Sequence, residues 1–164
     1  NRYTAELIGN VFEAYEAYPD ADVIHFQALD LDCNCLHAYP ADYVSSVEIT
    51  FRRDVKVRFD ERFGLGSERL CSGEEEVWMK DVRDAGYCVR YVPEPIVMTP
   101  AGTTGAFFVG NAKLQMSKGA TFKYVYGTPD ALWRTLKEAG WWMVHRGANP
   151  FPILYNMLKG MVEV

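Results

Sequence analysis

The chain has 164 residues, of which 49% are hydrophobic and 14% aromatic, and this is enough apolar material to bury a core, which excludes extensive disorder. Its formal net charge of −5 argues against a nucleic-acid partner, which normally meets a basic surface. Four cysteines are few for a disulfide scaffold, and no stretch approaches the ~20 apolar residues of a membrane span, so a cytoplasmic protein with reduced thiols is expected.

The first part of the chain shows helical and extended patterns in turn. Residues 4–18 repeat apolar side chains at the helical period, and residues 22–29 predict a strand that a polar turn joins in a hairpin to a second strand at 36–39. Residues 45–51 fit either a strand or a short helix. Residues 59–66 hold two glycines and a charge cluster between aromatic side chains, which predicts a structured loop.

A second helix is predicted to begin after Ser72 and to run to about Ala85. Ser72 is a favoured N-cap residue, and Glu75 follows three residues later, as in a capping box. Gly86 is placed to end the helix in a left-handed conformation. The buried face of this helix is expected to comprise Val77, Trp78, Val82 and Ala85.

The rest of the chain predicts one more extended segment and then helices. Residues 87–92 read as a strand that the Pro93-Glu94-Pro95 run stops, and residues 96–99 resume extended structure. Three helices are expected beyond Pro100, at residues 106–126, 130–143 and 151–161. This order predicts an α/β fold with a helical C-terminal tail.

Charge divides the chain into two parts. Residues 1–105 hold 10 Lys/Arg and 19 Asp/Glu, whereas residues 106–164 hold 7 and 3. We therefore expect one α/β part at 1–105 and a helical extension at 106–164 that packs on it.

Three successive carboxylates, Glu74, Glu75 and Glu76, stand at the start of the predicted second helix. A purely structural explanation exists, because each acid at the positive end of a helix contributes about 0.3–1 kcal/mol. Three sequence motifs around these carboxylates indicate that they have a role beyond the helix start. The sequence reads FDERFGLG at 59–66, SGEE at 72–75 and AGYCVRYVPEP at 85–95.

In this order and at these distances the three motifs resemble the second half of the catalytic domain of family 2 glycosyltransferases. That family has an FDExFG loop, a G-E-D or G-E-E triplet that opens a helix, and a GY-x-x-x-YVPE strand, and the match spans about residues 57–97. The resemblance implies a partial GT-A fold, with a mixed sheet and flanking helices, of which this chain is the C-terminal, acceptor-side half. It also implies transfer of a sugar from a nucleotide-diphosphate donor to an acceptor hydroxyl, with inversion.

The resemblance assigns roles to six residues. It places the general base at the acidic pair, with Glu75 at the position that is usually Asp and Glu74 as the alternative. Such a carboxylate would take the proton of the acceptor hydroxyl as the diphosphate leaves. The acceptor is expected to lie against the loop and the helix start, at Gly66, Ser67, Ser72 and Gly73.

The metal and the donor are expected to bind elsewhere. In the resembled family, the nucleotide-binding repeats and the D-x-D motif that holds Mg²⁺ or Mn²⁺ precede the matched region, so the isolated chain is expected to be inactive and to bind no metal. Asp30 and Asp32 have the D-x-D letters but read as a hairpin turn, and the Cys33/Cys35 pair lacks a second Cys/His pair. His25 reads as a core residue.

Two matters stay open at this stage. The ten aromatic residues and the positive charge of residues 106–164 fit contact with an anionic membrane at the inner face of the cell membrane, where lipid-linked acceptors reside. They also fit a core or a homo-oligomer interface, which we favour because Trp is usually highly buried. The second open matter is whether the chain is an enzyme part that meets a nucleotide-sugar donor and a glycan or lipid-linked acceptor, or a non-catalytic GT-A-derived interaction or dimerisation module.

Overall fold

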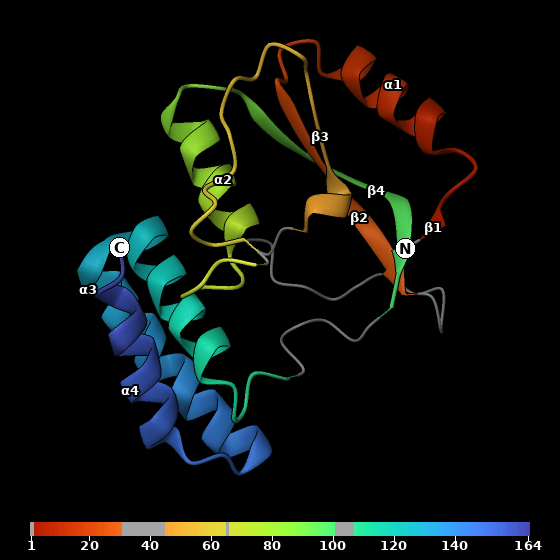
Figure 1. Ribbon diagram of the computed structural model, residues 1–164. Helices are drawn as coiled ribbons and strands as arrows, with labels where there is room; N and C mark the ends of the chain where they lie inside the picture. The colour runs from red at the N-terminus through yellow and green to blue at the C-terminus, as the bar shows by residue number, and fades with distance from the viewer. Residues whose placement is uncertain (1, 31–44, 65, 101–106) are drawn as a thin grey trace. The chain divides into compact units, whose positions relative to one another are not determined.

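The computed structural model describes residues 2–30, 45–64, 66–100 and 107–164 (Figure 1). The chain divides into two compact units, each described by itself below. The first unit comprises residues 1–58 and 78–103, and the second comprises residues 59–77 and 104–164. The segment 59–77, which carries the loop and the acidic triplet, thus clusters with the C-terminal helices and not with the α/β part to which the charge pattern assigned it.

The first unit is built on a four-stranded mixed sheet. Its strands, in spatial order, are β1 (Arg2–Tyr3), β4 (Val89–Thr99), β2 (Val23–Asp30) and β3 (Ile49–Phe51). β2 and β4 run parallel, whereas β1 and β3 pair antiparallel to their neighbours. The predicted α/β class with a mixed sheet is therefore confirmed. The ambiguous residues 45–51 form both expected structures, a short 3₁₀ helix at Ser46–Glu48 followed directly by β3.

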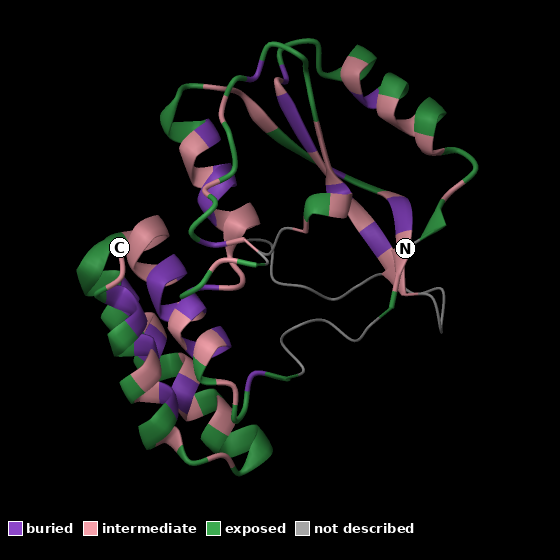
Figure 2. Cartoon of the chain, in the orientation of Figure 1, coloured by how far each residue is buried: buried purple, intermediate pink, exposed green. Residues whose placement is uncertain are grey.

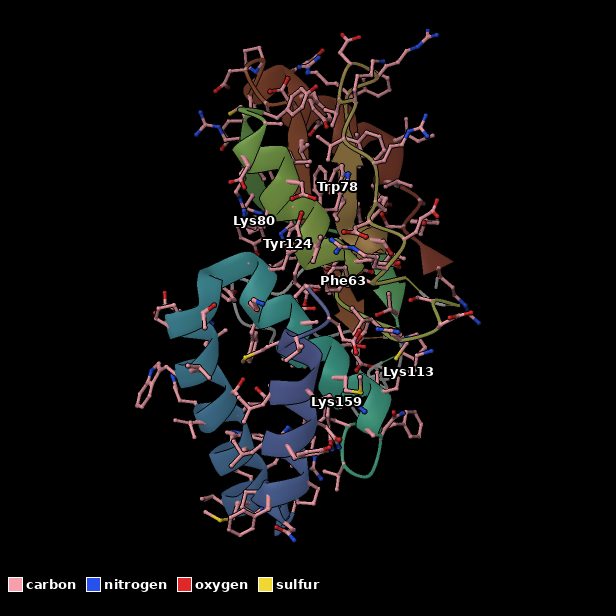
Figure 3. The ribbon with its side chains drawn as sticks, turned by 60° about the vertical axis from the view of Figure 1, so that its left-hand side comes forward. Phe63, Trp78, Lys80, Lys113, Tyr124 and Lys159 are labelled. Carbon is pink, nitrogen blue, oxygen red and sulfur yellow. The ribbon has the colours of Figure 1, made fainter. Side chains whose placement is uncertain are left out.

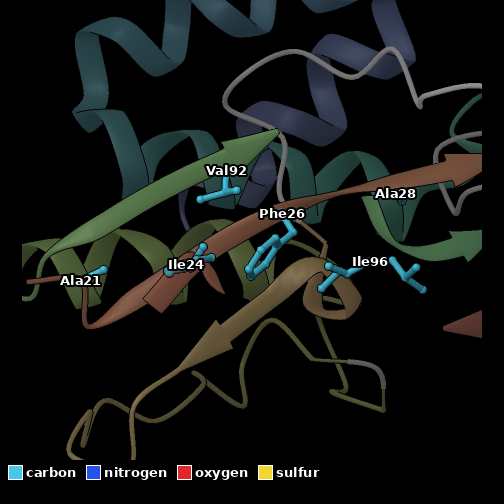
Figure 4. Close-up of a cluster of buried hydrophobic side chains, with 8 residues drawn as sticks. Ala21, Ile24, Phe26, Ala28, Val92 and Ile96 are labelled. Carbon is cyan, nitrogen blue, oxygen red and sulfur yellow. The ribbon is translucent and has the colours of Figure 1, made fainter. Parts of the chain in front are cut away.

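Helix α1 (Leu7–Ala17) covers one face of this sheet. Alternate residues of β2, namely Ile24, Phe26 and Ala28, point to this face and are buried with Ile96 (Figure 4). Leu7, Val11, Ala14 and Tyr15 pack against them from the helix. Alternate residues of β2 and the apolar face of α1 thus form one hydrophobic core.

The other face of β2 packs against the C-terminal part of α2 (Glu74–Asp84), which belongs to the first unit from Trp78 onward. Val23 is buried there with Trp78, Met79 and Val82. The Trp78 indole N–H donates to the Val57 carbonyl at 3.1 Å, so the large ring is buried without an unpaired polar group. Ala85, expected in the buried stripe, is exposed, and Met79 is buried instead.

The end of α2 follows the prediction closely. Gly86 adopts a φ of 85°, and its N–H donates to the Arg83 carbonyl. The next N–H, of Tyr87, donates to the Val82 carbonyl at 3.2 Å. A residue with a Cβ is disfavoured at this φ, so glycine terminates the helix as expected.

The prediction that the Pro93-Glu94-Pro95 run stops the strand is wrong. β4 continues from Val89 to Thr99, and it passes the prolines by shifting register against β2: His25 lies opposite Tyr91, whereas Gln27 lies opposite Pro95. Proline is tolerated in a sheet where a bulge removes the need for its missing N–H. The predicted strand at 36–39 and its hairpin lie outside the described residues, as do Asp32, Cys33, Cys35 and His37.

The second unit is mainly helical. Its long helix α3 (Ala112–Arg146) is interrupted at Gly127, whose φ of 77° and ψ of 167° are not helical, just before Pro129. Figure 1 shows that the chain reverses direction there, so α3 consists of two antiparallel arms, residues 112–126 and 128–146. Helix α4 (Pro150–Met161) follows. The three helices expected beyond Pro100 are thus present, although the first begins at Ala112, after its N-cap Asn111, and not at residue 106.

Two glycines allow α4 to lie directly on the first arm of α3. A methyl group on Gly119 would stand 1.9 Å from the Met157 carbonyl oxygen, and one on Gly160 would stand 1.9 Å from the Met116 carbonyl oxygen. No side chain fits at either position, so the two helix backbones touch. Both helices therefore form a rigid support for the segment 59–77 within the same unit.

Candidate functional site

All six residues expected to carry function lie in the segment 59–77 of the second unit. The segment is anchored to α3 at several points. The Cys71 N–H donates to the buried Ser117 hydroxyl at 2.8 Å, and the Lys113 ammonium donates to the Ser67 carbonyl at 2.5 Å. The Phe63 ring meets the Tyr124 ring edge-on at 5.8 Å (Figure 3). The first arm of α3 therefore fixes both ends of the loop that precedes α2.

The start of α2 differs from the prediction by one residue. The helix begins at Glu74, and the first helical hydrogen bond runs from the Val77 N–H to the Gly73 carbonyl at 3.1 Å. Gly73 is therefore the N-cap residue, and Ser72 lies one position before it. Glu75 occupies the second helical position, not the third that a capping box requires, so the predicted Ser72–Glu75 capping box is wrong.

Gly73 is held in this place by a contact that is distant in sequence. Its φ is 98°, and a methyl group there would come within 2.0 Å of the Thr121 hydroxyl oxygen. Thr121 is buried and donates its hydroxyl to the Ser117 carbonyl at 2.9 Å, so it cannot easily move aside. Glycine is thus required at 73 both by conformation and by space.

The Glu74 carboxylate lies against the glycine loop. A methyl group on Gly64 would come within 2.7 Å of Glu74 Oε2, so the absence of a side chain at Gly64 makes room for this carboxylate. Burial, and secondarily the charge of Glu75, raise the pKa of Glu74. Glu74 is therefore a stronger base than an exposed glutamate.

Glu75 is half-buried at the second position of the same helix. The backbone N–H groups of a helix start carry partial positive charge, which favours ionised carboxylates there. Glu74 and Glu75 are thus consecutive carboxylates in the first turn of α2, and the pKa of Glu74 is the one that is raised. A carboxylate of this kind can accept a proton from a hydroxyl group.

Gly66 and Ser67 form the far side of the loop. Gly66 has a φ of 99°, and the Ser67 N–H donates to the Gly64 carbonyl at 3.1 Å, which closes a tight turn. The turn places Gly64, Ser67 and the Glu74 carboxylate in one neighbourhood. The structure thus brings Glu74, Gly73 and the loop together, and it places Ser72 just before the helix.

A cavity of about 470 Å³ adjoins the same loop in the second unit. Its walls carry both hydrogen-bond donors and acceptors, and an ion pair between Arg69 and Glu163 at 2.6 Å spans part of it. The pocket is open and its lining is mainly apolar, and the Arg69 guanidinium and the Glu163 carboxylate bind each other. The cavity is lined by Glu61, Arg62, Ser67, Glu68, Arg69, Leu70 and Glu163.

Sequence reasoning missed the residues of α3 and of the chain end that build this site. Lys113, Ser117, Thr121 and Glu163 lie 46 residues or more from the loop and belong to segments that read only as helices. One signal was present: Ser117, Gly119, Ala120 and Thr121 form a run of small residues, which often marks a close approach of another backbone.

The remaining candidates behave as structural residues. In the first unit, His25 Nε2 lies 3.5 Å from the buried Glu48 carboxylate, which also accepts from the Ser45 N–H at 3.2 Å. His25 is thus enclosed with a partner, consistent with a core role.

Among the described residues, no group of three His, Cys, Asp or Glu side chains is arranged to hold a metal ion. Within the same residues, no helix is long and apolar enough to cross a membrane.

Comparison with known proteins finds no protein family, no curated protein and no solved structure that matches this chain.

Proposed function

We propose that this chain is the acceptor-side half of a family 2 glycosyltransferase with a GT-A fold, and that it acts in glycan biosynthesis in the cytoplasm. The reaction is the inverting transfer of a sugar from a nucleotide diphosphate to an acceptor hydroxyl. The acidic pair at the start of α2 supplies the general base.

One observation carries the proposal: the Glu74 carboxylate, in the first turn of α2, lies against Gly64 of the glycine loop, where there is no side chain between them. Gly64 leaves room for the Glu74 carboxylate, and Gly73 lets the helix start lie on Thr121. A helix-capping role alone requires neither feature. Together with the order of the three motifs at 59–66, 72–75 and 85–95, this geometry supports acceptor activation better than a purely structural role.

The chemistry at this site consists of one proton transfer coupled to one substitution. The acceptor oxygen attacks the anomeric carbon, the bond from that carbon to the diphosphate breaks, and the acceptor proton passes to the carboxylate. The motif resemblance assigns this proton to Glu75, and Glu74 is the alternative because burial raises its pKa. Gly66, Ser67, Ser72 and Gly73 form the surface on which the acceptor lies.

The donor and the divalent cation belong to a part of the enzyme that precedes the matched motifs. Mg²⁺ or Mn²⁺ bound there would neutralise the charge on the leaving diphosphate. The described residues of this chain form no cluster that would hold the ion. The chain's own contribution is to position the acceptor and to take its proton.

The proposal is tested by sugar transfer in a protein that joins this chain to a donor-binding half. Transfer to acceptors should be lost when both carboxylates are replaced, as in Glu74→Gln with Glu75→Gln, while the circular dichroism spectrum stays unchanged. Full transfer activity in this double variant would favour the alternative, a non-catalytic interaction or dimerisation module.

A further inference from the structure

The connection between α3 and α4 exposes an unusual amount of apolar surface. We call residues 141–151 the hairpin tip. Val144 is 73% exposed and Phe151 is 76% exposed, and Trp141 and Met143 are also exposed. Trp141 and Phe151, and equally Trp133 in the second arm of α3, are therefore not part of a core, so that of the expected environments a homo-oligomer interface and a membrane surface remain for them. These side chains need another environment.

The apolar surface continues along α4. Four of its residues are exposed at intervals of four, three and four, which places them in one stripe on the outer face of the helix. They are Phe151, Tyr155, Leu158 and Val162. Figure 2 shows that exposed segments recur along the α4 ribbon. The opposite face of α4 is already buried, by Ile153, Met157 and Gly160. A helix that is apolar on both faces is expected to be covered on both.

Charge indicates what covers this surface. Residues 139–162 contain no Asp or Glu, whereas they contain His145, Arg146 and Lys159. His145 and Arg146 are exposed at the tip itself, and Lys159 is exposed on α4. Basic side chains beside exposed aromatic and aliphatic ones complement an anionic lipid surface, where the cations meet phosphate groups and the apolar side chains enter the acyl region.

The backbone of the tip is suited to an environment poor in water. The Gly147 N–H donates to the Met143 carbonyl at 3.0 Å, and the Ala148 N–H donates to the Trp142 carbonyl at 3.2 Å. The Asn149 side chain accepts from the Phe151 N–H at 3.1 Å. These three backbone N–H groups therefore keep their hydrogen bonds when the tip meets a lipid surface.

We propose that the hairpin tip and the outer stripe of α4 dock on an anionic membrane surface. Trp141, Val144 and Phe151 insert at the boundary between the headgroups and the acyl chains, and Arg146 and Lys159 bind lipid phosphates. The docking is peripheral, and it does not depend on sugar transfer by this chain. Its test therefore needs neither a donor nor an acceptor.

The test is flotation of the full chain with vesicles of phosphatidylcholine, with and without phosphatidylserine. Binding should require phosphatidylserine and weaken with salt. The double variant Val144→Ser/Phe151→Ser should bind at least about tenfold more weakly, because two apolar side chains no longer enter the lipid. Arg146→Gln should weaken binding about fivefold, and only on the anionic vesicles.

A matched control is available in the first unit, where Ile8 and Phe12 on α1 are about as exposed as the tip residues. The variant Ile8→Ser/Phe12→Ser should float as the unmodified chain does. The proposal is wrong if the unmodified chain does not float with anionic vesicles, or if the control loses binding as strongly as the tip variant. It is also wrong if sedimentation shows a dimer that the tip variant dissociates while no vesicle binding occurs, because a second copy would then cover the tip.

Discussion

Gly73 and Thr121 are in such close contact that a methyl group on Gly73 would stand 2.0 Å from the Thr121 hydroxyl oxygen. Because Gly73 is the first residue to accept a helical hydrogen bond in α2, this contact sets the position of the Glu74–Glu75 pair relative to α3. The geometry of the candidate site therefore depends on a residue 48 positions away.

The first prediction concerns this contact. Gly73→Ala should lower the free energy of unfolding by about 1–2 kcal/mol for the left-handed backbone, with about 1–3 kcal/mol more for the collision with Thr121. When Thr121→Ala is added to the Gly73→Ala variant, the loss of stability from the collision should disappear, whereas the loss from the left-handed backbone should remain. A double-mutant cycle from urea unfolding measures this coupling. Strictly additive effects would show that the two residues do not touch in solution.

The second prediction concerns the pH dependence of stability at Glu74. Its pKa is raised in the folded state, so between the unfolded and the folded pKa the folded chain binds more protons, and stability falls as pH rises through that window. At neutral pH the ionised side chain is therefore destabilising. Glu74→Gln should raise the melting temperature at pH 7, and the gain should vanish below roughly pH 4.

The control for this measurement is Glu13→Gln on α1, where the side chain is exposed. It should leave the melting temperature nearly unchanged at both pH values. A lower melting temperature for Glu74→Gln at pH 7 would mean that Glu74 is ionised because it stabilises the helix start, contrary to our account.

The third prediction concerns the support beneath the site. Gly160→Ala should destabilise the chain by about 3 kcal/mol or more, because its methyl group would collide with the Met116 backbone and neither helix backbone can yield alone. Gly140→Ala is the matched control, since nothing lies within 4 Å of its added methyl group, and it should be neutral or stabilising. The melting temperatures of both variants, measured by thermal unfolding, test this prediction. Equal melting temperatures would contradict the close packing of α3 and α4.

The fourth prediction concerns the donor. The chain alone should bind neither UDP-sugars nor GDP-sugars with useful affinity, with or without Mn²⁺, because the elements that hold the nucleotide and the ion are expected outside it. Titration calorimetry measures this directly. Micromolar binding would show that the chain contains a donor site and would contradict its assignment as the acceptor half.

Local signals in the sequence were sufficient for much of the fold. The apolar strand run of β2, the helical period of α1 and the glycine at the end of α2 each depend on neighbouring residues, and each was predicted correctly. Pro93 and Pro95 were interpreted wrongly because their effect depends on register: a bulge against β2 accommodates them, and no local pattern encodes it.

The candidate site was predictable only in part, for the same reason. The sequence indicated the acidic pair and the glycine loop, but it placed the N-cap at Ser72, since a serine is normally preferred there to a glycine. The contact with Thr121 overrides that preference and moves the cap to Gly73. The grouping of residues 59–77 with the C-terminal helices likewise arises from contacts with Lys113, Ser117 and Tyr124 that cannot be read from local sequence.

The central claim is that the acidic pair at the start of α2 takes the acceptor proton, and the rate of sugar transfer by the Glu75→Gln variant tests it most directly. The measurement uses the protein that joins this chain to a donor-binding half, with Glu76→Gln, the third carboxylate of the same helix start, as the control that leaves the pair in place. We expect Glu75→Gln to lower turnover by roughly 10²–10⁴ at an unchanged melting temperature, and Glu76→Gln to keep its activity. If Glu75→Gln and Glu74→Gln each retain full turnover, the pair is not the base, and the account of the site is wrong.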